Sequence, residues 1–275
     1  MKTSPARVKI FFPKISDASW GGKRFVDFLV KEMTKNKSIR YAGYRKVIDL
    51  RRDLLRYLGR NNAGIPYMPI PAPGKKKIKK TISLAVAKSH KLLPHPDLPI
   101  FVFIYPWLPD KDTAISFGGV TGFTTYYTAH LFIDMRNYDQ RSLTQTIVHE
   151  WNHLVFYRHH PEGNYTLKTH MIMEGLAEIF TEEVTGGKPS PWAVALSEKE
   201  IKKQFAALKE KLNKRSIALY RNVFFGNREY RRWTGYAIGY KLAKSYRQKN
   251  PKVSWEKIIT TEAGRIGGPL KTKRV

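Results

Sequence analysis

The stretch Thr146–Tyr157 reads TIVHEWNHLVFY and places two histidines and a glutamate inside an apolar run. His149 and His153 are four residues apart, so on a helix they lie on one face, one turn apart. A buried charged group is costly unless it is paired or binds a metal. Apolar neighbours such as Val148 and Trp151 argue against an ordinary solvent-exposed polar helix. The stretch therefore predicts a buried helix that binds a metal ion.

The spacing of the three polar residues matches the HExxH pattern of zinc enzymes. Two imidazoles one turn apart can bind one Zn²⁺ at about 2.0–2.1 Å each, and Glu150 then projects beside the metal. A carboxylate in that position can accept a proton from a zinc-bound water, whose pKa falls to about 7 on coordination. We therefore expect His149 and His153 to be zinc ligands and Glu150 to be a general base.

A catalytic zinc ion needs a third protein ligand, and the stretch MIMEGLAEIF offers one on the next predicted helix. Glu174 follows His153 after a short loop, and Glu178 lies one turn beyond it on an otherwise largely apolar helix. We assign Glu174 to the metal and Glu178 to a hydrogen bond that orients a zinc-bound histidine through its other ring nitrogen. The reverse assignment of the two glutamates stays open. His170, one turn before Glu174, is a further candidate ligand.

The stretch WTGYAIGYKLAKSY carries two stripes of residues at helical spacing. Gly235 and Gly239 are four residues apart, and such a glycine stripe lets another helix approach closely. Tyr236 and Tyr240 have the same spacing and present two phenols on one side. They either belong to helix packing, or one of them donates a hydrogen bond to the oxyanion that forms during hydrolysis. For the catalytic role we prefer Tyr236, which is nearer the start of the helix, and Tyr240 stays open.

Together these motifs resemble the gluzincin metallopeptidases, and most of all a family of predicted zinc-dependent proteases named as a domain of unknown function. The resemblance rests on GGVTGFTTYY, IVHEWNH, MEGLAEIF and WTGYAIGYKLAKSY and covers about residues 98–250. It implies a zincin-like fold, one Zn²⁺ per chain, hydrolysis of peptide bonds and a Gly-Tyr segment after the third ligand. Relatives are often exported or lipid-anchored, whereas this chain shows no signal sequence.

The pattern along the chain predicts an α+β protein, with helices, then a small sheet, then helices. The apolar run IFVFIY at 100–105 predicts a buried strand. The stretch 114–135, rich in Thr, Tyr and Phe, predicts two short antiparallel strands around a glycine turn or bulge. We expect a mostly antiparallel sheet whose edge strand, about 122–128, can bind an extended peptide. Helices are expected at 17–33, 44–59, 75–93, 167–184, 197–214, 232–249 and 254–261, and from 139 through the HExxH motif.

Charge is unevenly distributed along the 275 residues, which carry a formal net charge of +28. Residues 1–91 contribute +18 and residues 191–275 contribute +15, whereas residues 92–190 contribute −5. Basic proteins of this kind commonly contact an anionic surface such as nucleic acid or anionic lipid. A lysine-rich solvated surface explains the charge equally well, and the run KKKIKK at 75–80 reads first as a solvated helix start. No nucleic-acid-binding motif is present.

These features predict three parts. Residues 1–91 form a basic, mainly helical extension, residues 92–262 a zincin-like metallopeptidase domain with a mainly helical C-terminal half, and residues 263–275 a basic tail. The absence of Cys fits a reducing compartment. No stretch is apolar enough to span a membrane, and the N-terminal apolar patch is too short for a secretory signal. We expect a cytoplasmic protein, with export by another route left open.

The sequence therefore predicts a zinc-dependent peptidase, a hydrolase that acts on a peptide or protein substrate. The alternative is a nucleic-acid-associated basic protein that retains a zincin-like metal-binding fold and contacts phosphates through its basic flanks. A metal-free scaffold is a third hypothesis, against which the complete set of ligand residues argues.

Overall fold

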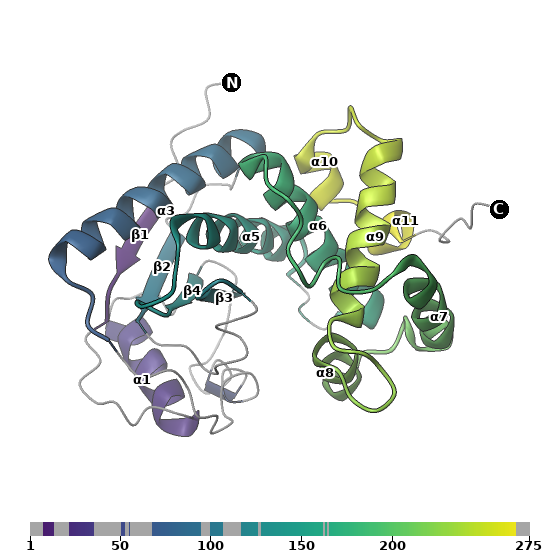
Figure 1. The fold of residues 1–275 in the computed structure, drawn as a ribbon, viewed down its shortest axis with the longest axis horizontal. Coiled ribbons are helices and arrows are strands. Elements are labelled where there is room, and N and C mark those ends of the chain that lie inside the picture. Colours follow the sequence, from purple (N-terminus) through teal and green to yellow (C-terminus); the bar gives the residue numbers. More distant parts are fainter. Residues whose placement is uncertain are drawn as a thin grey trace. The chain divides into compact units, whose positions relative to one another are not determined.

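The chain forms two compact units, residues 1–158 and residues 159–275 (Figure 1). The computed structural model describes residues 8–13, 22–35, 51–52, 55, 68–94, 100–106, 117–125, 128–161, 163 and 165–267. The first unit contains a sheet with helices, and the described part of the second is helical. The α+β class is therefore confirmed.

The first unit is built on a four-stranded sheet in the order β1-β2-β4-β3. Its strands are β1 (Val8–Phe11), β2 (Ile100–Tyr105), β3 (Val120–Thr125) and β4 (Thr128–Ile133). β2 runs parallel to both β1 and β4, and only β3 and β4 are antiparallel. The sheet is mixed, so the prediction of a mostly antiparallel sheet is wrong. Parallel partners lie far apart in sequence and leave no local turn signal, although the fully buried apolar run of β2 is typical of them.

The predicted antiparallel pair of strands is confirmed in β3 and β4. The glycines of this segment, however, lie before β3 and within it. Gly118 and Gly119 have φ values of 61° and 77° and form the turn before β3. The Asp134 backbone N–H donates to the Gly119 carbonyl over 2.8 Å. Gly122 pairs with Leu131 within the regular ladder. The connection between the two strands falls outside the described residues.

Helices α1 (Gly22–Lys35), α3 (Ala72–Leu92) and α5 (Gln140–His159) belong to the first unit. Trp151 of α5 donates its ring N–H to the Leu93 carbonyl over 3.0 Å and stacks edge-on against His90 of α3. The helices predicted from 75 and from 139 are confirmed. Residues 17–21 and most of the predicted helix 44–59 lie outside the described residues.

The second unit contains six α-helices in its described part. They are α6 (Leu167–Thr185), α7 (Glu198–Leu208), α8 (Ile217–Phe225), α9 (Thr234–Lys249), α10 (Trp255–Ile259) and α11 (Ala263–Ile266). The ends of α6 follow from local chemistry: the Thr166 side chain caps its start and Gly186, in the left-handed region, ends it. The predicted helix 197–214 is too long, because a 3₁₀ turn at Lys209–Lys211 ends it. The sequence did not predict α8.

Helices α6 and α9 cross with their backbones in direct contact. A Cβ atom on Gly239 would collide with the Met171 carbonyl oxygen, and one on Gly175 would collide with the Gly239 carbonyl. Gly235, one turn earlier, lies against the Phe224 ring of α8. The close helix approach predicted from the glycine stripe is confirmed. This crossing sets Glu178 and Glu182 of α6 near Tyr240 of α9.

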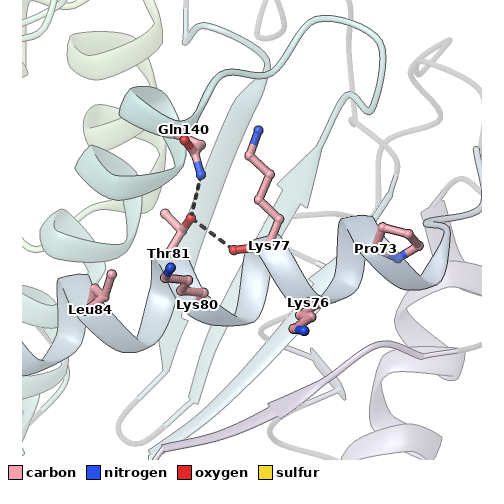
Figure 2. A pocket seen from close by; sticks show the side chains of 7 residues that line it. All are labelled: Pro73, Lys76, Lys77, Lys80, Thr81, Leu84 and Gln140. Carbon is pink, nitrogen blue, oxygen red and sulfur yellow. Dashed lines mark hydrogen bonds between the residues drawn. The ribbon is translucent and has the colours of Figure 1, made fainter.

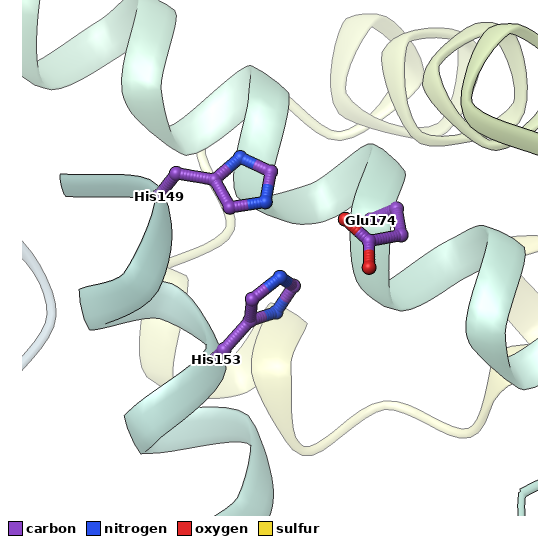
Figure 3. Close-up of side chains that lie close together, drawn as sticks. All are labelled: His149, His153 and Glu174. Carbon is purple, nitrogen blue, oxygen red and sulfur yellow. The ribbon is translucent and has the colours of Figure 1, made fainter. Parts of the chain in front are cut away.

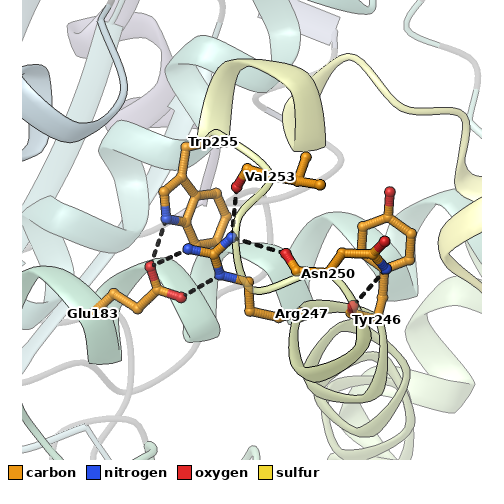
Figure 4. A network of polar contacts seen from close by, with 6 residues as sticks. All are labelled: Glu183, Tyr246, Arg247, Asn250, Val253 and Trp255. Carbon is orange, nitrogen blue, oxygen red and sulfur yellow. Dashed lines mark hydrogen bonds and ion pairs between the residues drawn. The ribbon is translucent and has the colours of Figure 1, made fainter.

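A polar network around Arg247 ties α6, α9 and α10 together (Figure 4). The Arg247 guanidinium donates to both carboxylate oxygens of Glu183, over 2.7 Å from Nε and 3.1 Å from Nη2. It also donates to the Val253 carbonyl over 2.6 Å and stacks on the Trp255 ring. Trp255 in turn donates its ring N–H to Glu183 over 2.8 Å. A paired, half-buried guanidinium of this kind fixes the end of α9.

Several elements lie in segments that the sequence assigned outside the central domain. β1, α1 and nearly all of α3 fall within residues 1–91, where β1 pairs with β2, and α11 falls within residues 263–275. The boundaries at 91 and 262 stay predictions. No helix in the described part of the chain combines the length and apolar character needed to cross a membrane.

Candidate metal and catalytic site

Three residues predicted to bind zinc lie together. His149 and His153 belong to α5 and Glu174 belongs to α6, and their candidate ligand atoms all lie within 4.8 Å of one another. Figure 3 shows the two rings and the carboxylate turned toward one another. His153 and Glu174 are buried and His149 is half-buried.

The chemistry of this group fits a zinc ion. Zinc in enzymes binds imidazole nitrogen and carboxylate oxygen at about 2.0–2.2 Å, with three protein ligands and one open position. The group supplies two nitrogens and one carboxylate, and the rings of His149 and His153 meet edge to face at 4.6 Å. Glu174 is only 7% exposed, so a metal ion held by these three residues would be largely shielded from water on that side.

Glu150 lies between the histidines in sequence and against the edge of the sheet. It is 4% exposed, and its Oε2 accepts a hydrogen bond of 2.5 Å from the Thr124 hydroxyl on β3. A Cβ on Gly122 would come within 3.1 Å of the Glu150 Oε1. The absent side chain at this position therefore leaves room for that oxygen. One carboxylate oxygen is held by Thr124 of the strand, and the other lies beside Gly122.

Sequence reasoning did not single out Thr124 or Gly122. It predicted only two short strands around a glycine turn or bulge within residues 114–135. The spacing of these two residues carried the signal, because alternate residues of a strand point to one face. Two small residues at positions 122 and 124, beside a helix with a buried acid, indicate the strand positions that face it.

Glu178 and His170 make contacts of their own within the second unit. The Glu178 carboxylate accepts a hydrogen bond of 2.8 Å from the Trp192 ring N–H and a longer one of 3.4 Å from the Ser190 backbone. His170 packs against the rings of Tyr165 and Tyr220, at 5.7 and 4.7 Å between centroids. The predicted role of Glu178 in orienting a histidine stays a prediction.

The two tyrosines of α9 lie in different surroundings. Tyr236 is half-buried, edge-on to Phe224 at 4.9 Å between ring centroids. Tyr240 is buried, and its hydroxyl accepts a hydrogen bond of 2.6 Å from Lys244. Burial, then a hydrogen bond with Glu182, raises the pKa of Tyr240 above its usual value, so it remains a neutral phenol.

Two helices therefore bring together three residues that could hold a metal ion, with the Glu150 carboxylate beside the two histidines in α5. Such a combination is typical of zinc hydrolases. The chain belongs to the family described as "Predicted Zn-dependent protease (DUF2268)", whose match covers residues 78–267. This confirms the resemblance to a family of predicted zinc-dependent proteases, whereas the resemblance to the gluzincins stays a prediction.

Among curated proteins, the chain is similar to the "Uncharacterized protein YjfC" of Bacillus subtilis (strain 168). The two are 25% identical over 145 residues, which make up 47% of this chain and 46% of that protein. The chain thus aligns with about half the length of this relative. No solved structure matches the chain.

Proposed function

We propose that the protein is a zinc-dependent peptidase that hydrolyses peptide bonds, with one zinc ion per chain. The gathering of His149, His153 and Glu174 into one group carries the proposal. The placement of Glu150 beside the two histidines in α5 supports it, and so does membership of a family described as predicted zinc-dependent proteases.

In this mechanism His149, His153 and Glu174 hold the metal. A zinc ion held there would supply the Lewis acidity needed to polarise the scissile carbonyl and to favour ionisation of water. Glu150 accepts a proton from the attacking water and passes it to the leaving amine. Tyr236 or Tyr240 donates a hydrogen bond to the oxyanion that develops on the carbonyl.

The substrate is bound along β3. This strand lies at the edge of the described sheet, with residues 121–124 half-buried. An extended peptide can add to such an edge through main-chain hydrogen bonds. Because Thr124 and Gly122 of β3 touch the Glu150 carboxylate, a peptide on this strand would lie close to the general base.

The metal assignment is tested by replacing Glu174 with Ala. The purified wild-type protein should contain about one zinc per chain, and the variant should lose most of it because one of three ligands is removed. Zinc is measured by mass spectrometry of the protein after dialysis. Glu182→Ala, on the same helix, is the control and should keep its zinc. If Glu174→Ala retains all of its zinc, the third ligand is Glu178 or His170 instead.

The oxyanion assignment is tested by Tyr236→Phe, with Tyr240→Phe as its partner. A phenol that acts only in the transition state affects turnover rather than binding. Tyr236→Phe should therefore lower kcat by about 10²-fold, as loss of one oxyanion donor does, with KM and zinc content little changed. A fall in kcat confined to Tyr240→Phe would assign the oxyanion donor to Tyr240, one helical turn further along α9. Normal turnover in both variants would show that the two tyrosines contribute only to helix packing.

A further inference from the structure

Helix α3 presents an open groove of about 400 Å³ that contains three lysines (Figure 2). The lysines lie on the second and third turns of the helix, and Gln140 at the start of α5 forms the facing wall. Pro73 and Leu84 lie at the two ends of the helical segment that lines the groove. The lining residues are Pro73, Lys76, Lys77, Lys80, Thr81, Leu84 and Gln140.

The wall of the groove is fixed by packing and by two hydrogen bonds. The opposite face of α3 is buried through residues such as Ile78, Ile82 and Val86. Gln140 donates to the Thr81 hydroxyl over 3.3 Å, and Thr81 donates to the Lys77 carbonyl over 3.1 Å. The lysine-bearing side of the helix therefore has a set orientation and faces solvent.

Acidic side chains do not neutralise these lysines within the described part of the chain. α3 contains no Asp or Glu, and none of the ion pairs found among the described residues includes Lys76, Lys77 or Lys80. Asp139, next to Gln140, instead caps α5 by accepting from the Ser142 backbone N–H over 2.6 Å. Three like charges kept together in a concave surface favour an anionic occupant.

We propose that this groove binds an acidic polypeptide segment of about five residues in extended conformation. The helix from Pro73 to Leu84 is about 16 Å long at 1.5 Å per residue, which matches about five extended residues at 3.3 Å each. Acidic side chains meet the lysines in the middle. An apolar side chain packs on Leu84, which is 56% exposed.

The lining favours a polypeptide over the other common polyanions. Single-stranded nucleic acid is bound by aromatic rings on which bases stack, and no aromatic residue is among the described residues that line the groove. A membrane-surface helix buries a broad apolar face in lipid, whereas the apolar face of α3 packs inside the protein. A peptide that is acidic in the middle and apolar at one end matches the order of side chains along α3. The proposal does not depend on the peptidase activity.

The test measures binding of fluorescently labelled peptide LEEEL to the full chain by anisotropy at low and at physiological salt. Lys76→Gln/Lys77→Gln/Lys80→Gln should weaken binding about tenfold at low salt, because three exposed ion pairs are lost. A variant with glutamine at Lys202, Lys203 and Lys209, which are exposed outside the groove, matches the charge change and should bind like wild type. Glutamine keeps the helix propensity of lysine.

Two further comparisons distinguish an acidic peptide from other ligands of the groove. Leu84→Ala should weaken LEEEL about threefold, whereas Leu92→Ala, exposed on α3 outside the groove, should not. Peptide LQQQL, oligo(dT) of twenty nucleotides and phosphatidylserine vesicles are tested against the same variants. Equal losses in both triple-lysine variants, or equal binding of LQQQL, would overturn the proposal. A groove variant that loses oligo(dT) or vesicles but keeps LEEEL would reassign the groove to a phosphate-bearing partner.

Discussion

Replacing Glu150 with Gln is expected to lower peptide hydrolysis by about 10³-fold while zinc stays bound. General bases typically contribute 10²–10⁴-fold, and an amide cannot accept the proton of the attacking water. Glutamine keeps the size of the side chain, and its carbonyl oxygen can still accept the hydrogen bond from Thr124. The substitution therefore removes the basic group and leaves the packing against β3 in place.

The measurements are kcat on an unfolded protein substrate, zinc per chain and the melting temperature. Glu256→Gln, an exposed residue of α10, is the matched control and should retain wild-type activity. A Glu150→Gln protein that folds, binds zinc and hydrolyses at the wild-type rate would refute the proposed mechanism.

The second large effect concerns the crossing of α6 and α9. Gly239→Ala is expected to destabilise the second unit by about 3 kcal/mol, toward the severe end of single substitutions. The added Cβ would meet the Met171 carbonyl oxygen, which is backbone and cannot rotate away. The helices would have to separate, and the buried contacts around them would loosen.

Intrinsic helix propensity predicts the opposite sign, which makes this test sharp. Alanine is favoured over glycine inside a helix by about 1 kcal/mol. Gly264→Ala in α11 is the control, because a Cβ there meets nothing within 4 Å, and it should be neutral or slightly stabilising. Thermal unfolding followed by circular dichroism compares the two. A Gly239→Ala protein as stable as the Gly264→Ala protein would show that the helices are not in backbone contact.

The structure could be predicted best from the sequence where the residue pattern is local and repeats along the chain. The long helices carry 3.6-residue periodicity, and α6 ends at a glycine as its sequence indicates. His149 and His153 were paired by helical spacing alone. Glu174 could be added to this pair because it interrupts an apolar helix, where a charged side chain is costly unless it is paired or binds a metal.

Most of the features that the sequence did not predict depend on contacts between residues far apart in the chain. The parallel pairing of β2 with β4 joins two strands without any turn between them. The nine residues of α8 are mostly apolar, and a run of that length and composition fits a strand as well as a helix. The hydrogen bond from Thr124 to Glu150 depends on which strand comes to lie beside α5.

The position of β3 has a consequence for selectivity. A peptide added to this strand is recognised through its own backbone N–H and C=O groups, which every sequence carries. Folded proteins keep most of those groups paired internally, so few of their segments can offer a free extended stretch. A peptidase that selects its substrates at β3 would discriminate by conformation. It would degrade damaged or unfinished chains of many sequences and spare their folded counterparts.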